Sequence, residues 1–139
     1  MICPVCKSDM IVVEYNDIEL DYCDQCRGVW FDAGELELIL QKLELESEHI
    51  LFTNMLQSPP AVTSEKLRKC PICSRKMRKA NLGGQPELLV DLCIREDGIW
   101  FDGGEVAQLI QQLARGQAGG DGPQQKLMNF IGEVFQAQE

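Results

Sequence analysis

The sequence predicts an α+β protein made of two tandem units, each a β-hairpin followed by an α-helix, with one further amphipathic helix at the C-terminus. Three observations lead to this prediction. A motif that begins at residue 3 is repeated from residue 70, apolar and polar residues alternate in the middle of each copy, and apolar residues at helical spacing follow. With 139 residues, 45% of them hydrophobic and 25% charged, the chain has the composition of a folded protein.

The repeat is a duplication of the chain. Residues 3–6 (CPVC) match residues 70–73 (CPIC), and residues 28–35 (GVWFDAGE) match residues 98–105 (GIWFDGGE). The offset between the copies rises from 67 to 70 within the unit, because the second copy carries additional residues around the GGQP sequence at 83–86. Glycine and proline at this point predict that the insertion lies in a turn.

Each copy is expected to contain one hairpin. Residues 18–22 (IELDY) and 88–92 (LLVDL) place apolar side chains at every second position, the period of a strand with one buried face. The first hairpin is predicted to turn near residues 16–17.

A helix is expected after each hairpin. Asp32 and Glu35 have the spacing of a capping box, and Asp102 and Glu105 repeat it. An apolar stripe at helical spacing follows each box, and we expect both stripes, together with Trp30 and Trp100, to form core. The stripes consist of Leu36, Ile39, Leu40 and Leu43 in the first copy, and of Val106, Leu109, Ile110 and Leu113 in the second.

These patterns divide the chain into five segments. The first unit with a long helix is predicted to cover residues 1–57, and a linker with two prolines to cover 58–66. The second unit is predicted at 67–115, a glycine-rich tether at 116–122, and an amphipathic helix at 123–139. Whether the first helix bends beyond Leu45 is left open by the sequence.

The last helix is expected to dock on another surface, because a short isolated helix is marginal in water. Leu127, Phe130, Ile131 and Val134 form its apolar stripe. The stripe could cover the protein's own core, a partner or a second copy of the chain. Together with the apolar run at 50–56, it is our candidate for a contact surface, including one that forms a homo-oligomer.

The cysteines carry the candidate chemistry. Cys3, Cys6, Cys23 and Cys26 form two CxxC pairs with the spacing of a zinc site. Two-residue gaps allow both sulfurs of a pair to face one ion, and the hairpin brings the pairs together in tetrahedral geometry. We also expect Gly28, two residues after the last ligand, to adopt a positive φ.

The second copy retains three of the four cysteines. Cys70, Cys73 and Cys93 are present, and the register through residues 98–105 puts Glu96 at the position of Cys26. We expect Glu96 to be the fourth ligand, with its neighbour Asp97, a water molecule or a metal-free unit as the alternatives. An oxygen ligand in place of sulfur predicts weaker zinc binding than at the first site.

Zinc is expected to hold each unit together, since a unit of this size buries too little apolar surface to fold without a staple. Chelation of the metal should therefore unfold the first unit.

The pattern CPxC, a second CxxC and GxWFDxGEL resembles the transcription-factor-IIB-type zinc-ribbon family of small zinc-finger domains. The resemblance implies two tandem zinc ribbons, the second without its fourth cysteine. It also implies zinc binding by the cysteines named above, and the family name suggests transcription, although a fold does not fix a function.

Charge is distributed unevenly along the chain. The net charge is −9, with 13 basic and 22 acidic residues, yet residues 66–79 contain seven cations and no acid. This basic segment is either a solvated surface or a site for an anionic partner. Its cations are Lys66, Arg68, Lys69, Arg75, Lys76, Arg78 and Lys79.

A non-catalytic interaction module that binds a protein partner is the function that the sequence favours. A four-thiolate zinc has no open coordination position, and the sequence shows no catalytic triad, phosphate loop or HExxH motif. The only histidine, His49, is expected to be solvated. Nucleic-acid binding through the basic segment is the first alternative, disfavoured by the net charge. The second is electron transfer by iron in a rubredoxin-like site.

A cytoplasmic location without membrane contact is expected. No apolar stretch is long enough for a membrane helix, a ligand-like cysteine at position 3 leaves no room for a signal peptide, and cysteine pairs of a reducing compartment commonly hold metal.

Overall fold

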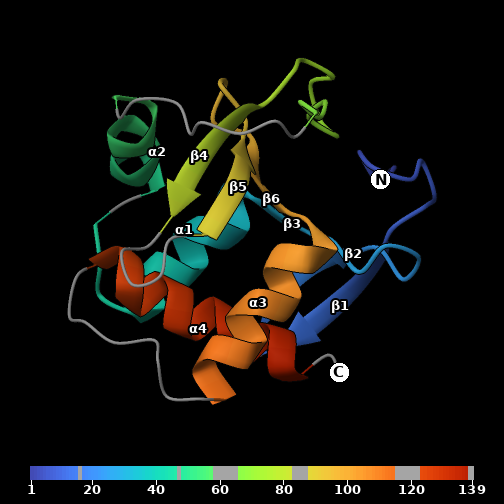
Figure 1. Ribbon diagram of the computed structural model, residues 1–139. Coiled ribbons are helices and arrows are strands. Elements are labelled where there is room, and N and C mark those ends of the chain that lie inside the picture. The colour runs from blue at the N-terminus through green and yellow to red at the C-terminus, as the bar shows by residue number, and fades with distance from the viewer. Residues whose placement is uncertain (16, 47, 58–65, 83–87, 115–122, 138–139) are drawn as a thin grey trace.

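The two copies of the repeat form one antiparallel sheet of six strands, with helices on one of its faces (Figure 1). The computed structural model describes residues 1–15, 17–46, 48–57, 66–82, 88–114 and 123–137. The elements, in chain order, are β1 (Ile11–Tyr15), β2 (Ile18–Tyr22), β3 (Val29–Asp32), α1 (Ala33–Lys42), α2 (Glu48–Gln57), β4 (Arg78–Leu82), β5 (Leu88–Leu92), β6 (Gly98–Phe101), α3 (Gly103–Ala114) and α4 (Pro123–Ala137).

The hairpins lie where the alternating patterns predicted them, as β1–β2 and β4–β5. Each unit has a third strand in addition, which the sequence analysis did not predict. The strand order is β1-β2-β3-β6-β5-β4, so the two third strands pair with each other at the centre of the sheet. Trp30 of β3 lies opposite Trp100 of β6 at the middle of this pairing. The repeats are therefore joined by backbone hydrogen bonds into a single sheet.

The helix start of the first repeat follows the capping prediction. Asp32 is the N-cap of α1, and its Oδ1 accepts a hydrogen bond from the Glu35 amide at 2.9 Å. In the second repeat Asp102 Oδ1 accepts a hydrogen bond from the indole Nε1 of Trp100 at 2.7 Å. The first helix is bent rather than straight, because α1 ends near Leu43 and Glu44 adopts a φ of 57° before α2 begins.

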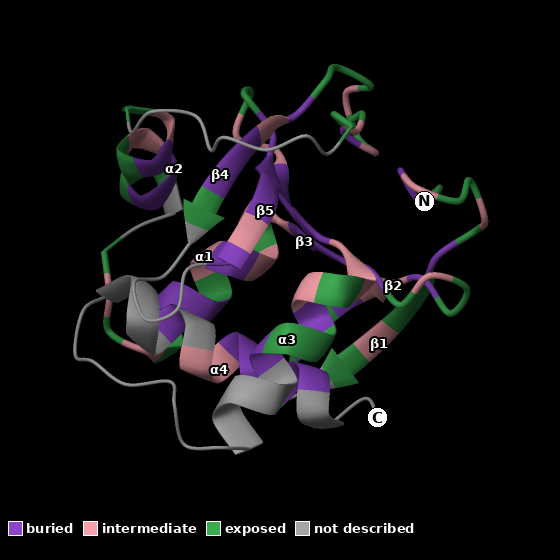
Figure 2. Ribbon diagram, in the orientation of Figure 1, coloured by how far each residue is buried: buried purple, intermediate pink, exposed green. Residues whose placement is uncertain are grey.

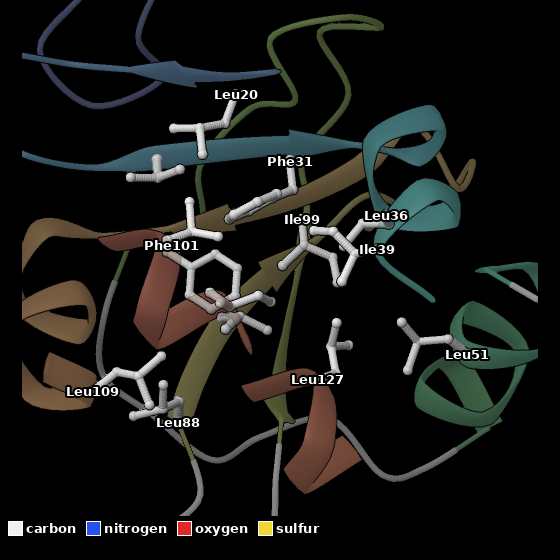
Figure 3. Packing of buried hydrophobic residues seen from close by; sticks show 14 of the residues in the cluster. Leu20, Phe31, Leu36, Ile39, Leu51, Leu88, Ile99, Phe101, Leu109 and Leu127 are labelled. Carbon is white, nitrogen blue, oxygen red and sulfur yellow. The ribbon is translucent and has the colours of Figure 1, made fainter. Parts of the chain in front are cut away.

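The main core lies between the sheet and the helices α1, α2, α3 and α4 (Figure 3). Alternate residues of the central strands face it, among them Phe31 of β3 and Phe101 of β6. Phe135 of α4 packs against both, with ring centroids 5.9 and 5.5 Å away. The central strands are buried except at Asp32, the last residue of β3, whereas β1 is largely exposed (Figure 2).

Helix α4 is part of this core and does not present its apolar stripe to a partner. Leu127, Ile131 and Val134 are fully buried within the protein, and Phe130 is partly buried against the same cluster. The expectation that this stripe binds a partner or a second copy is wrong, because the stripe covers the sheet of its own chain.

The apolar run at 50–56 behaves in the same way. Leu51, Phe52 and Met55 of α2 are buried in the main core, and Ile50 is the one apolar residue of the run that is exposed. This run is therefore core as well, and it leaves no continuous apolar face for a second copy.

The predicted tether at 116–122 and all but the end of the predicted linker at 58–66 lie outside the described residues. Among the residues that are described, no helix has both the length and the hydropathy to cross a membrane.

Candidate metal centres

Tight turns bring the first four cysteines together. In the first CxxC turn the Lys7 amide donates to the Cys3 carbonyl at 3.1 Å, and in the second the Arg27 amide donates to the Cys23 carbonyl at 2.8 Å. The residue after the second cysteine of each pair has a left-handed conformation, with φ of 64° at Lys7 and 69° at Arg27. The predicted positive φ at Gly28 is thus wrong by one position, since Arg27 makes this turn.

The four sulfurs of the first site have the spacing of a tetrahedral zinc centre. Cys3 and Cys26 lie 3.6 Å apart and Cys6 and Cys23 lie 3.2 Å apart, and all four ligand atoms fall within 4.8 Å of one another. Zinc–sulfur bonds of about 2.3 Å give a tetrahedron with edges of about 3.8 Å. The site also supplies an amide donor, because the Val5 amide lies 3.4 Å from Cys3 Sγ. These residues fit a structural zinc.

The second site assembles three thiols and the carboxylate of Asp97. Cys73 Sγ lies 3.7 Å from Cys93 Sγ, and Asp97 Oδ2 lies 3.7 Å from Cys70 Sγ and 3.4 Å from Cys93 Sγ. A tetrahedral zinc with bonds of about 2.3 Å to sulfur and 2.0 Å to oxygen separates the two atoms by about 3.5 Å. The four donors therefore fit one ion. Three of them are soft thiolates, whereas the first site has four.

Glu96, the residue predicted as the fourth ligand, does not belong to this group. Its Oε1 lies 2.8 Å from His49 Nδ1, and the His49 side chain is 71% exposed. Asp97, the alternative candidate, supplies the fourth ligand atom, the role that the alignment of the two repeats assigned to Glu96. His49 is exposed to solvent as predicted, and it also contacts Glu96.

A change of turn explains this shift by one residue. The turns that begin at Cys3, Cys23 and Cys70 close with an amide four residues later, whereas the turn that begins at Cys93 closes with the Glu96 amide, three residues later. The left-handed residue moves with the hydrogen bond, and Glu96 has a φ of 62°. A side chain on this residue points out of the turn, and the next one, Asp97, points in. No spacing rule in the sequence signals this difference.

Burial keeps most of the thiols protonated in the absence of metal. Burial raises the pKa of the Cys3, Cys26 and Cys70 thiols, and it raises that of Cys93 to about 12. Hydrogen bonds with the backbone and side chain of Ser8 lower the pKa of the exposed Cys6 to about 6. A metal ion must displace the protons of the buried thiols, so its affinity depends on pH.

The structure exposes some cations of the basic segment and engages others in contacts within the protein. Lys66, Lys69, Arg75 and Lys76 are exposed, and Arg68 is partly exposed. Arg78 donates to the Leu56 carbonyl at 2.7 Å. Lys79 is buried and lies 2.8 Å from the buried Asp91, so this cation is not available to a partner.

The comparisons with known proteins support the first site. Residues 2–42 match the sequence model of a family described as a transcription factor zinc-finger, the TFIIB-type zinc ribbon. Neither a curated protein nor a solved structure matches the chain. The matched residues include all four ligands of the first site, and the second cluster has the same arrangement with Asp97 in place of a cysteine. Residues 2–42 thus match a TFIIB-type zinc ribbon, and the cluster of Cys70, Cys73, Cys93 and Asp97 fits a second, weaker ribbon that lacks the fourth cysteine.

Proposed function

We propose that the protein is a non-catalytic interaction module, held together by zinc, that binds an acidic surface of a partner protein with the second ribbon. The observation that carries this proposal is a group of exposed basic and apolar side chains at its two CxxC-type turns. We call this group the second-ribbon tip. It consists of Lys69, Ile72, Arg75, Lys76, Ile94 and Arg95.

The tip combines charge with exposed apolar surface. Ile72 is 50% exposed and Ile94 is 48% exposed, and each follows closely on the first cysteine of its turn. Neither residue is needed for the main core. Exposed apolar side chains surrounded by cations suit a partner segment that carries acidic and apolar residues together.

The first ribbon lacks this surface although it has the same fold. Ile2, Ser8, Asp9 and Gln25 stand where the tip has Lys69, Arg75, Lys76 and Arg95. The position of Ile94 is taken by Asp24. Because both ribbons need the same turns, the cations at the tip are not a requirement of the fold.

The backbone also places two tip lysines against each other. Lys69 and Lys76 are antiparallel bridge partners, at the position where the first ribbon pairs Ile2 with Asp9. Like charges directly opposite each other are destabilising. An acidic partner group would relieve this repulsion, which favours an anionic partner at this point.

Nucleic acid is the second candidate for the tip. The tip contains no aromatic residue, and both tryptophans are fully buried. Contacts would then be limited to phosphates, with steep salt dependence and little sequence preference. The acidic balance of the first ribbon also disfavours a polyanion. The family description favours a protein partner that acts in transcription.

Fluorescence anisotropy with defined probes tests the proposal. The probes are a peptide of alternating glutamate and leucine, its lysine counterpart, and single- and double-stranded oligonucleotides. We expect the zinc-loaded chain to bind the acidic peptide, and the double variant Lys69→Glu/Lys76→Glu to lose about tenfold in affinity, as expected when several ion pairs are removed. Lys7→Glu, at an exposed lysine of the first ribbon, is the matched control and should change little.

Equal losses in both variants, or no binding of the acidic peptide, would contradict the proposal. Sequence-selective oligonucleotide binding that persists at about 200 mM salt would instead favour the nucleic-acid function. The colour of protein purified from its own host tests the remaining alternative, since iron bound by thiolates is red and zinc is colourless.

A further inference from the structure

The two metal centres share one buried cluster on the face of the sheet opposite the main core. Trp30, Trp100, Met10 and Met77 belong to it. The buried thiols of both sites belong to the same cluster, namely Cys3 and Cys23 of the first site and Cys70 and Cys93 of the second. Each tryptophan therefore belongs to a cluster that also contains thiols of both metal centres.

The tryptophans cross over to the opposite ribbon. A Cβ atom at Gly28, in the first ribbon, would overlap the edge of the Trp100 ring, coming within 2.5 Å of its Cη2. A Cβ atom at Gly98, in the second ribbon, would lie 2.6 Å from Trp30 Cζ2. Glycine is required at both positions because the indole of the other repeat occupies the space of a side chain, and at Gly98 the Phe31 carbonyl oxygen occupies it as well.

These two glycines close the metal-binding turns. The Gly28 carbonyl accepts a hydrogen bond from the Cys23 amide at 3.0 Å, and the Gly98 carbonyl accepts one from the Cys93 amide at 3.1 Å. Trp100 thus packs on the turn that carries Cys23, and Trp30 packs on the turn that carries Cys93.

The first residues of α1 and α3 also contact the opposite repeat. The Ala33 amide, at the start of α1 in the first ribbon, donates to the Asp97 carbonyl of the second site at 2.8 Å. Gly103, at the start of α3 in the second ribbon, is so close to the Cys26 carbonyl of the first site that a Cβ atom would overlap it. The fourth ligand of each site is therefore supported by the other repeat.

We propose that Trp100 is a positioning residue for the first metal site and Trp30 for the second, and that metal binding at the two sites is coupled. Loss of metal from one site frees its turn, which removes support from the tryptophan and helix start that hold the other site. Residues that support metal ligands from outside typically change metal affinity by 10- to 100-fold when mutated. The second site, with its oxygen ligand, would empty first and weaken the first site in turn. This inference does not depend on the partner proposed above.

Cobalt titration of the full-length metal-free chain tests the crossing, because thiolate-only and mixed sulfur–oxygen sites have different visible spectra. Both sites can then be followed in one chain with every ligand present. We expect Trp100→Phe to weaken cobalt binding at the four-thiolate site by about tenfold or more, and Trp30→Phe to weaken it at the Asp97 site. Each substitution should change the other site less.

Ile131→Val is the matched control, since it alters a buried residue of α4 in the main core, on the face of the sheet opposite both metal centres. General destabilisation should weaken both sites to the same degree. The crossing is refuted if each tryptophan variant affects mainly the site of its own ribbon, or if both sites weaken equally as in the control.

Amide hydrogen exchange provides a second measurement if a tryptophan variant fails to fold. Asp97→Ala should release metal from the second site alone at limiting zinc. We expect the amides of Cys23 and Arg27 in the first site then to exchange about tenfold faster than in the fully loaded wild type. Unchanged protection of these amides would refute the coupling.

Discussion

Lys79 Nζ lies 2.8 Å from Asp91 Oδ1, and both side chains are almost completely buried. The two residues are direct partners across the β4–β5 hairpin, and Asp91 is in turn opposite Trp100. The first repeat keeps the aspartate as Asp21 but has Val12 in place of the lysine. One ribbon therefore balances this carboxylate with a cation, and the other leaves it beside exposed apolar surface.

Replacing Lys79 by methionine should destabilise the fold strongly. The substitution keeps the volume but leaves the Asp91 carboxylate buried without its cation, and breaking a buried pair in this way costs about 3–5 kcal/mol. Urea denaturation of the zinc-loaded chain measures the loss. Lys76→Met, at an exposed lysine on the same ribbon, should change the free energy of unfolding by no more than about 0.5 kcal/mol. Similar effects of the two substitutions would show that the pair has no special role.

Introducing the missing cation into the first ribbon should stabilise it. Burial first and then the nearby Asp32 charge raise the pKa of Asp21 above its ordinary 3.8. A raised carboxyl pKa means that stability is greatest below pH 3.8 and is lost as pH rises through the folded pKa, so the charged Asp21 is unfavourable at neutral pH. Val12→Lys places an ammonium directly across from it and should add about 0.2–1 kcal/mol at pH 7.

The salt dependence of this gain separates pairing from other effects. The gain should shrink at high salt, because salt screens a partly exposed ion pair, and Val12→Gln should not produce it at any salt concentration. Thermal unfolding of the three zinc-loaded chains at pH 7, in about 0.1 M and about 1 M salt, gives the comparison. A gain that is the same for lysine and glutamine would mean that removal of exposed Val12, and not the charge, is the cause.

The roles of neighbouring residues 96 and 97 can be separated by metal affinity. Asp97→Ala removes a ligand of the second site and should lower zinc affinity there by at least tenfold, whereas Glu96→Ala removes only the contact with His49 and should leave it unchanged. Asp97→Cys should tighten the site, because a fourth thiolate suits zinc better than a carboxylate. Competition with a chromophoric chelator measures all three. Loss of zinc in Glu96→Ala with retention in Asp97→Ala would reverse the assignment.

The sequence predicted well those parts of the fold that depend on local pattern. The alternation around Ile18 and Leu88 predicted the hairpins, the cysteine spacing predicted the first site, and Asp32 capped its helix as expected. Each of these features is determined by residues that are close in sequence or by a spacing that few other structures require.

The features that join the repeats were missed because they depend on contacts between distant residues. Residues 29–31 are β-branched or aromatic and so favour a strand, but nothing local shows that this strand pairs with its own counterpart. The stripe of Leu127 and Ile131 shows amphipathicity without showing which surface it covers. The choice of Asp97 over Glu96 depends on one hydrogen bond in a turn, which spacing does not reveal.

Acid should release metal from both sites. Because burial raises the pKa of the Cys3, Cys26, Cys70 and Cys93 thiols, these groups carry protons at neutral pH when metal is absent. Zinc binding should then release at least these four protons, and zinc affinity should fall as pH decreases. Calorimetry in buffers with different ionisation enthalpies counts the released protons. A count near zero at pH 7 would show that the metal-free chain already holds thiolates.

The C-terminal helix should be essential for stability, contrary to what its position after a glycine-rich segment suggests. Phe135 packs between Phe31 and Phe101 beneath the centre of the sheet, so Phe135→Ala should cost about 3–5 kcal/mol, the range for emptying an aromatic site in a core. Glu133→Ala, at an exposed position of the same helix, is the control and should change stability by no more than about 0.5 kcal/mol. Denaturant unfolding with zinc in excess measures both.

Truncation after residue 122 gives the stronger form of this prediction. It removes Leu127, Ile131, Val134 and Phe135 together and exposes the apolar face of the central strands. Since most domains are stable by only about 5–15 kcal/mol, the shortened chain should lose its cooperative unfolding transition even when zinc is present. If it keeps both that transition and its zinc, the metal centres alone stabilise the sheet, and the helix contributes little to stability.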